Sequence, residues 1–413
     1  METIEILPLA ALGIIFLCGY CAGQLANRLK FPRVTGYLLA GILLSPSVSG
    51  IISLEMVEGK FSIVTDIALA IIAYSIGGTL NLSQLKQLRK SIFWINLTQS
   101  LGAFFVTFTF IALLGPFIIR LPSSGNTFFE AYLPLALILG AVSVATAPAA
   151  ILAIVHEYKA KGPLTTTLLA VVALDDGSAI ILYALASTLV GAFVTPEGLS
   201  VYKVVAEPAL IILSSIILGT CFGFSLTTII ARIKRRDSLL VVILGHILLC
   251  AGVAEHLNLS PLLVNMTLGF FLINRSKQGH APFIVVENIE EPLFALFFTL
   301  AGAHLDINVL NNAGLMALIL IVARFSGKLM GTKLGAGLTN APEVVTKYLG
   351  FGLLPKAGVT VGLVLAAQSL FNPQVSEVMI NAVLASVIIN ELIAPPLVKY
   401  ALVTSGEATG SNL

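Results

Sequence analysis

The 413 residues are 57% hydrophobic and only 11% charged, with a formal net charge of +2, and the mean hydropathy is +0.99. This composition excludes a soluble globular protein and predicts an integral membrane protein. No basic patch suggests a nucleic-acid partner, and no hydrophilic block is long enough to fold by itself. We therefore expect a single membrane domain over residues 1–413 and no soluble domain.

Apolar segments of about 20 residues follow one another along the chain and predict thirteen transmembrane helices. The predicted spans are 5–27, 34–53, 62–80, 91–117, 132–155, 164–194, 203–231, 238–254, 260–274, 283–304, 311–338, 343–370 and 375–403. The first segment has acidic residues before it and no cleavage site of small residues after it, so it is expected to be a permanent helix rather than a signal peptide.

The basic residues between the spans predict the orientation. With the N-terminus outside and the C-terminus in the cytoplasm, sixteen fall on the inner side: Arg28, Lys30, Arg33, Lys86, Arg89, Lys90, Lys159, Lys161, Arg232, Lys234, Arg235, Arg236, Arg275, Lys277, Lys347 and Lys399. The outer side then holds only three: Lys60, Arg120 and Lys203. This asymmetry follows the positive-inside rule and predicts a multi-pass protein of the cell's inner (plasma) membrane.

Two of the spans are interrupted by glycine and proline. Span 132–155 contains Pro148, and span 343–370 contains Pro355 followed by Lys356. A proline in a helix interior removes a backbone donor and clashes with the preceding turn. A single such proline indicates a kink, but two breaks seven helices apart lie in oppositely oriented spans. That pattern predicts an inverted repeat, with a transporter binding site at the two breaks.

Two adjacent acids, Asp175 and Asp176, lie inside span 164–194. Ionisable residues are rare inside the membrane and indicate a functional site there. Burial disfavours the charged form of a carboxylate, so a proton can compete with a cation for one oxygen site. Thr146, with its hydroxyl and an opened backbone carbonyl, is the expected second ligand of a hard cation such as Na⁺. Ser143 is a secondary candidate in the same break.

Three basic residues lie deep in their spans and need partners: Arg324, Lys328 and Lys356. Lys356 is expected to offset the exposed carbonyls of the second break. Arg324 lies one turn before Lys328 on the same helix face; it either pairs with an acid or holds helix ends together, and the second is favoured. For Glu391, before Pro395-Pro396, solvation at the membrane interface is favoured over a role in transport.

A further group of ionisable residues precedes and begins span 283–304. It consists of His280, Glu287, Glu290 and Glu291. A charged helix entrance is the favoured interpretation, and a pH-sensing funnel is the alternative.

These motifs occur together in an order that resembles the cation/proton antiporter superfamily, in particular its second branch of bacterial Na⁺/H⁺ antiporters and Kef-type relatives. The resemblance is carried by Thr146-Ala147-Pro148, Asp175-Asp176, Gly327-Lys328-Leu329-Met330-Gly331, Phe31 to Gly41, Ser260 to Met266, and Gly352 to Gly358. Some relatives have an aspartate where this chain has Ala147, so the charge compensation at the break must come from elsewhere.

The resemblance implies an all-α fold of thirteen transmembrane helices, with two crossing broken helices. A core of helices at about 91–194 and 311–403 would move against a dimerisation domain in an elevator-like step. It also implies that Asp176 binds cation and proton in competition and that Asp175 pairs with Lys328. Two acids in this motif are typical of electrogenic exchangers.

The expected function is therefore secondary active Na⁺(Li⁺)/H⁺ antiport by a homodimer, serving pH homeostasis, with a monovalent cation, the proton and membrane lipid as the partners. No cofactor is expected. The alternatives are K⁺/H⁺ antiport or a Kef-like K⁺ efflux system and, from another class, a cation channel. No Ser/His/Asp set, metal cluster or Gly-rich phosphate loop indicates an enzyme or an ATP-driven pump.

Overall fold

The computed structural model describes residues 7–53, 55–118, 128–194, 206–233, 236–276, 278, 280–305, 308–356 and 358–409, and within these ranges it is helical with no β-strand. Parts of the sequence-based predictions lie outside these residues. They include the ends of spans 5–27 and 203–231, residue 357 of the second break, and the basic residues Arg120, Lys203, Lys234, Arg235 and Lys277.

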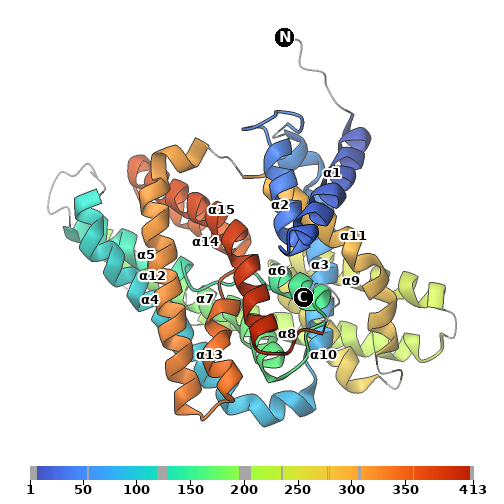
Figure 1. The fold of residues 1–413 in the computed structure, drawn as a ribbon. Helices are drawn as coiled ribbons and strands as arrows, with labels where there is room; N and C mark the ends of the chain where they lie inside the picture. The colour runs from blue at the N-terminus through green and yellow to red at the C-terminus, as the bar shows by residue number, and fades with distance from the viewer. Residues whose placement is uncertain are drawn as a thin grey trace.

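The helices follow the predicted apolar spans closely (Figure 1). Their bounds are α1 Pro8–Arg28, α2 Arg33–Leu44, α3 Ser62–Thr79, α4 Leu82–Ile118, α5 Leu133–Val142, α6 Pro148–Glu157, α7 Pro163–Val194, α8 Glu207–Ile230, α9 Arg236–His256, α10 Pro261–Arg275, α11 Ala281–Ala303, α12 Asn308–Leu338, α13 Glu343–Gly352, α14 Gly358–Ala366 and α15 Pro373–Thr404. By length and composition, eight of the described helices can cross a membrane; α2, α5 and α6 are shorter apolar helices.

Two predicted boundaries are wrong. α2 ends at Leu44 rather than at 53, because Pro46 follows Ser45 and a residue before proline is driven out of the helical conformation. α4 begins at Leu82 rather than at 91. Its first turns are polar, so hydropathy does not detect them, but the Asn81 side chain accepts a hydrogen bond from the backbone N–H of Ser83 (3.0 Å) and starts the helix there.

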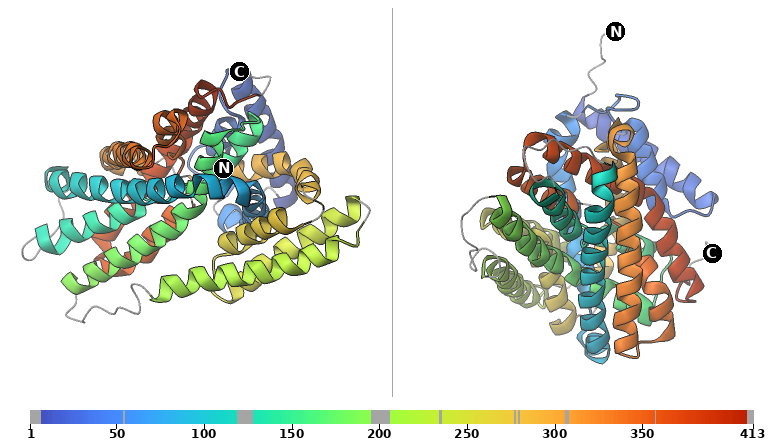
Figure 2. Two further views of the ribbon diagram at one scale, coloured as in Figure 1. Left: turned by 90° about the horizontal axis from the view of Figure 1, so that it is seen from below. Right: turned by 90° about the vertical axis from the view of Figure 1, so that its left-hand side faces the viewer.

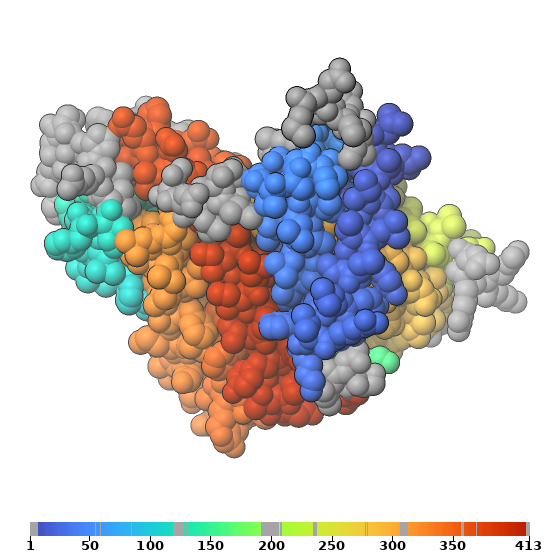
Figure 3. Space-filling model, turned by 45° about the horizontal axis from the view of Figure 1, so that its top comes forward, coloured from blue at the N-terminus to red at the C-terminus, as the bar shows by residue number. Residues whose placement is uncertain are grey.

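The helices pack in two groups. One contains α4, α5, α7 and α12–α15, and the other contains α1–α3 and α8–α11. Figure 3 shows the boundary between the groups, where α15 lies directly beside α2. The first group contains α5 and the second interrupted segment, α13 and α14, while α6 packs against α7 and α15 on one side and against α2 and α3 on the other. Helices of the first group therefore position the candidate site.

Within the first group, α4 and α12 lie side by side along most of their length (Figure 2, right). Gly327, Gly331 and Gly335 are spaced four residues apart, so they share one face of α12. A Cβ at position 331 would lie 2.6 Å from the Cα of Gln99. The Thr98 hydroxyl also donates across this contact to the carbonyl of Gly331 (2.7 Å). Small residues at four-residue spacing allow this close backbone approach in membranes.

We expect Gly331→Ala to destabilise the bundle. The added methyl forces α12 away from α4, and overpacking of this kind costs about 1–3 kcal/mol. Gly337→Ala is the matched control, because a Cβ there meets nothing within 4 Å on the same helix. Thermal unfolding in detergent should give a clearly lower midpoint for Gly331→Ala than for Gly337→Ala. Equal midpoints would show that the helices separate at no cost.

The two interrupted segments cross at their breaks. α5 ends at Val142 and α6 begins at Pro148; α13 ends at Gly352 and α14 begins at Gly358. The backbone N–H of Ala147 donates to the carbonyl of Pro355 across the crossing (2.9 Å). The two breaks are thus joined by a backbone hydrogen bond.

The chain after α15 fixes the start of α7. The Glu407 carboxylate accepts hydrogen bonds from the backbone N–H groups of Leu164 and Thr165, both at 2.7 Å, and from the Thr165 hydroxyl at 2.7 Å. A carboxylate at a helix N-terminus satisfies donors that have no partner within the helix and favours the helix dipole. The helix that carries the two aspartates is therefore anchored at its first turn.

Candidate functional site

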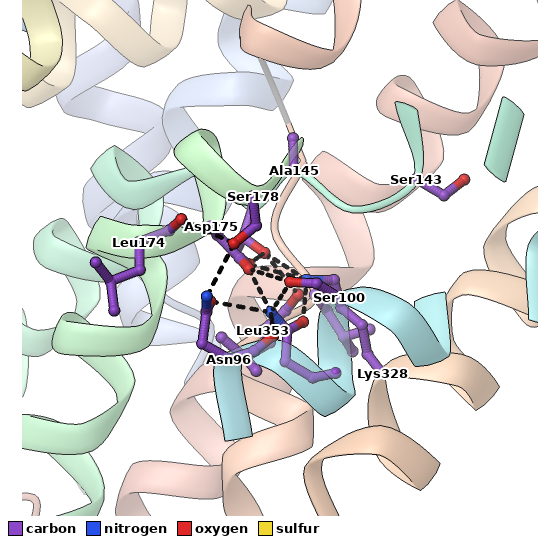
Figure 4. A network of polar contacts seen from close by, with 12 residues as sticks. Asn96, Ser100, Ser143, Ala145, Leu174, Asp175, Ser178, Lys328 and Leu353 are labelled. Carbon is purple, nitrogen blue, oxygen red and sulfur yellow. Dashed lines mark hydrogen bonds and ion pairs between the residues drawn. The ribbon is translucent and has the colours of Figure 1, made fainter. Parts of the chain in front are cut away.

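A buried ion pair lies beside the crossing of the two breaks (Figure 4). The Nζ of Lys328, on α12, is 3.0 Å from Oδ2 of Asp175, on α7, and both side chains are 0% exposed. Isolated charges are costly in an apolar interior, whereas paired and hydrogen-bonded charges are tolerated. The structure thus brings together the two residues that the family resemblance paired.

The Lys328 ammonium has a hydrogen-bond acceptor for each of its three N–H groups. Besides Asp175, it donates to the Thr146 hydroxyl (2.7 Å) and to Oε1 of Gln99 (2.8 Å). An ammonium offers three donors and no acceptor, so this set leaves none unused. Lys328 therefore holds together the break after α5, the middle of α4 and the middle of α7.

Both oxygens of Asp175 are also occupied. Oδ2 accepts from Lys328 and from the Thr146 hydroxyl. Oδ1 accepts from Nε2 of Gln99 and, at 3.4 Å, from the Ser100 hydroxyl. A carboxylate has about four lone-pair sites, so Asp175 has little capacity left for another ligand.

Asp176 is placed differently from its neighbour. Successive residues of a helix point about 100° apart, so Asp176 does not face Lys328 as Asp175 does. Its Oδ1 is buried and has no hydrogen-bond partner in the described part of the chain. The Thr146 hydroxyl, expected as the second ligand of the cation, bonds to Asp175 and Lys328 in this structure. Two adjacent aspartates therefore differ completely in their hydrogen bonding.

Arg324 connects the carbonyl groups of both breaks. Its Nε donates to Ser143 O (2.9 Å), its Nη2 to Ala145 O (2.8 Å) and its Nη1 to Leu354 O (2.6 Å). The guanidinium thus offsets the partial negative charge of the carbonyl ends at the crossing. Arg324 holds helix ends together, as favoured from the sequence, and no ion pair with an acid is found among the described residues.

The role expected of Lys356 is corrected by this arrangement. Its Nζ donates to the Ser386 hydroxyl on α15 (3.3 Å), while Arg324 rather than Lys356 meets the carbonyls. The guanidinium of Arg324 is better suited to bind several carbonyl groups, because its planar fork carries five donors. The Lys356 side chain, by contrast, is directed away from the carbonyls toward α15. The Ser143 hydroxyl donates to Leu139 O within its own helix (2.7 Å), so it does not contact the ion pair.

Glu391 is also not where the sequence suggested. The sequence favours solvation at the membrane interface, but Glu391 is 4% exposed and neither carboxylate oxygen has a hydrogen-bond partner in the described ranges. Glu391 is buried through tertiary contacts, because α15 is covered by α2, α6, α12 and α13.

A second polar cluster joins α6 to α2, α3 and α11. The His156 Nδ1 is 2.7 Å from Oε2 of Glu290, and the Ser75 hydroxyl donates to Oε1 of the same residue. The Arg33 guanidinium pairs with Glu291, and its backbone N–H donates to Glu157 (3.0 Å). A cavity of about 220 Å³ opens among these residues. Glu290 and Glu291, near the middle of α11, therefore bind α3 and α2, and Glu290 also links α11 to α6.

Three polar residues of α4 at the site are missing from the sequence-based candidates: Asn96, Gln99 and Ser100. Gln99 contacts both members of the ion pair, and Nδ2 of Asn96 donates to the Ser178 hydroxyl on α7 (2.8 Å). Polar groups inside an apolar span are a recognisable signal, because membrane helices place them against other helices. All three residues lie inside the apolar span 91–117, so the sequence carries this signal.

These features define a class of protein. In the described part of the chain, interrupted helices cross inside an all-helical bundle, and an acid beside the crossing has a buried oxygen without a hydrogen-bond partner. This is the arrangement of an ion transporter. Residues 12–400 match the model of the family described as "Sodium/hydrogen exchanger, transmembrane". The chain belongs to this family, and so to the cation/proton antiporter superfamily.

Individual relatives agree with this placement. The chain is 26% identical to the Na⁺/H⁺ antiporter NhaS4 of Synechocystis sp., covering 96% of this chain and 98% of the relative. It is 23% identical to the Na⁺/H⁺-K⁺ antiporter GerN of Bacillus cereus, covering 94% and 95%. The fold is similar to that of the sodium proton antiporter MjNhaP1 of Methanocaldococcus jannaschii at pH 8, with a TM-score of 0.71 at 18% identity over 96% of this chain and 98% of that one.

Proposed function

We propose that this protein exchanges Na⁺ for H⁺ across the plasma membrane and that Asp176 is the site which the two ions share. The observation that carries the proposal is the difference between the aspartates. Asp175 is occupied by Lys328, Gln99, Ser100 and Thr146, whereas Asp176 has a buried oxygen with no hydrogen-bond partner among the residues that the structure describes. A buried oxygen in this state needs a proton or a cation.

Competition for one carboxylate couples the two ions. When Asp176 is protonated, the site is neutral and holds no cation. When the proton leaves, the carboxylate binds Na⁺ with help from backbone carbonyls at the crossing, because Na⁺ prefers oxygen ligands. Since the two states exclude each other, each passage of a cation requires the return of a proton.

The ion pair determines whether the exchange moves charge. With Asp175 and Lys328 both charged, one Na⁺ exchanged for one H⁺ at Asp176 moves no net charge. If Na⁺ binding also takes a proton from Lys328, the cation-loaded site carries one negative charge more than the proton-loaded site. Two protons then return for each cation, and the cycle is electrogenic. A buried lysine releases its proton readily, which supports this second scheme.

The packing supports an elevator-type movement. The site residues Asp175, Asp176, Lys328 and Thr146 all belong to the first helix group and would move together as one body. The second group, with α1–α3 and α8–α11, would then form the scaffold and the contact of a homodimer. In this proposal the chain crosses the membrane thirteen times, with the N-terminus outside and the C-terminus inside.

K⁺ is the second candidate cation. GerN is named as a Na⁺/H⁺-K⁺ antiporter, and the relative AmhT of Alkalihalophilus pseudofirmus, 22% identical, is named as a subunit of an ammonium/H⁺ antiporter. These cations use the same oxygen ligands as Na⁺ and differ in size.

Purified protein in liposomes with an imposed pH gradient tests the function. We expect addition of Na⁺ or Li⁺ to dissipate the gradient, as reported by a ΔpH-sensitive dye, and K⁺ to do so less. A response to K⁺ alone would assign K⁺/H⁺ exchange. Cation conductance in a planar bilayer without any proton coupling would assign a channel and overturn the proposal.

A further inference from the structure

Gln99 occupies an unusual position between the two members of the ion pair. It lies in the middle of α4 and is 0% exposed. Its Oε1 accepts from Lys328 (2.8 Å), and its Nε2 donates to Asp175 and to the Ser100 hydroxyl (2.9 Å). The ammonium can only donate and the ionised carboxylate can only accept, so the amide can face just one way.

The amide completes the coordination of both charged groups. Lys328 has three donors, and Gln99 supplies one of its three acceptors. Asp175 has two oxygens, and Gln99 supplies a donor to the oxygen that does not contact Lys328. Hydrogen bonds to charged groups are stronger than those between neutral groups, and an amide adds no charge of its own. Without it, Oδ1 of Asp175 would keep only the 3.4 Å contact with Ser100.

We propose that Gln99 is a positioning residue that reserves Asp175 for Lys328, so that the transported cation and proton are confined to Asp176. The inference rests on the proposed function, because it concerns the same site. Its physical basis is the number of hydrogen-bond donors or cations that the Asp175 carboxylate can bind. An Asp175 oxygen released from Gln99 becomes a second carboxylate ligand, directly beside Asp176 in sequence, for any cation that enters.

The α4–α12 contact explains how Gln99 is held in place. The Cα of Gln99 lies against Gly331, where α12 has no side chain to separate the helices. This approach brings the amide within reach of Lys328, which lies on the same helix as Gly331. The glycine contact between these helices and the position of the amide are therefore parts of one arrangement.

Gln99→Met tests the proposal, because methionine is of similar length and apolar. We expect the apparent KM for Na⁺ in liposomes to fall about tenfold, with a lower Vmax as a more tightly held cation leaves more slowly. Ser100→Ala removes the 3.4 Å contact with Asp175 and one acceptor of the Gln99 amide, but it leaves the Gln99 contacts with Asp175 and Lys328. It should change KM in the same direction by less than about threefold. Gln87→Met, at an exposed position of α4, is the matched control and should leave KM unchanged.

A merely structural role predicts a different result. Loss of folded protein lowers Vmax but leaves KM as it was, so an unchanged or increased KM in Gln99→Met overturns the proposal. The stabilisation of detergent-solubilised protein by Na⁺ gives a second measurement that does not need transport. The midpoint of unfolding should begin to rise at a lower Na⁺ concentration in Gln99→Met than in the wild type, because ligand stabilisation sets in when the concentration exceeds Kd.

A double variant separates this inference from the function on which it rests. If Gln99 acts by keeping Asp175 on Lys328, then Gln99→Met should change KM much less in a Lys328→Ala background. Equal changes in both backgrounds overturn the role of Gln99. If the wild type dissipates the gradient on Na⁺ addition while Gln99→Met has an unchanged KM, the proposed function stands and only this inference fails. If the wild type shows no exchange, the proposed function itself fails.

Discussion

Asp176→Asn should abolish exchange. The amide has nearly the shape of the carboxylate, but it neither takes up a transported proton nor supplies a negative oxygen to a cation. Addition of Na⁺ to liposomes carrying this variant should leave the pH gradient as stable as in liposomes without protein. The expected effect is large because both ions are proposed to bind at this one carboxylate.

Asp66→Asn is the matched control for this experiment. It makes the same substitution at an exposed position of α3, in the other helix group, and should leave exchange near the wild-type rate. The folding of both variants can be compared by thermal unfolding in detergent. If folded Asp176→Asn protein still dissipates the gradient on Na⁺ addition, Asp176 is not the shared binding site of the cation and the proton.

Lys328→Ala should remove the charge movement of the cycle while some exchange persists. Removal of one partner from a buried ion pair leaves the other charge uncompensated, at a cost of about 3–5 kcal/mol. Asp175 is then expected to hold a proton throughout the cycle. The cation-loaded and proton-loaded sites carry the same charge in this variant, and the exchange becomes electroneutral.

Currents on a solid-supported membrane measure this change directly. Wild-type protein should give a transient current on Na⁺ addition, and its exchange should respond to an imposed membrane potential. Both responses should be lost in Lys328→Ala and kept in Lys333→Ala, which alters an exposed lysine of the same helix. Undiminished charge movement in Lys328→Ala would exclude the proposed role of Lys328 in proton release.

Some of the corrections described above have a common physical cause. Hydropathy reports how a residue partitions between water and lipid, so it finds apolar spans but not a polar helix start such as that of α4 at Leu82. Hydropathy also does not show which buried polar groups form hydrogen bonds or ion pairs with each other. Lys356 and Arg324 are both basic and deep, and only the crossing of the breaks shows that Arg324 reaches the carbonyls. Glu391 lies inside α15, four residues before Pro395, and its burial depends on the helices that cover it.

The sequence by itself determined the membrane class, the helical spans, the two interruptions and the candidate acids and bases. It could do so because apolar length, proline and buried charge each have a local physical cost that is visible in one chain segment. Only the tertiary structure decided how the acids differ. Asp175 and Asp176 are chemically identical neighbours, and the partners that separate them come from α4, α12 and the break after α5. Gln99 acquires its position only when α4 meets the glycine face of α12, a contact between segments more than two hundred residues apart.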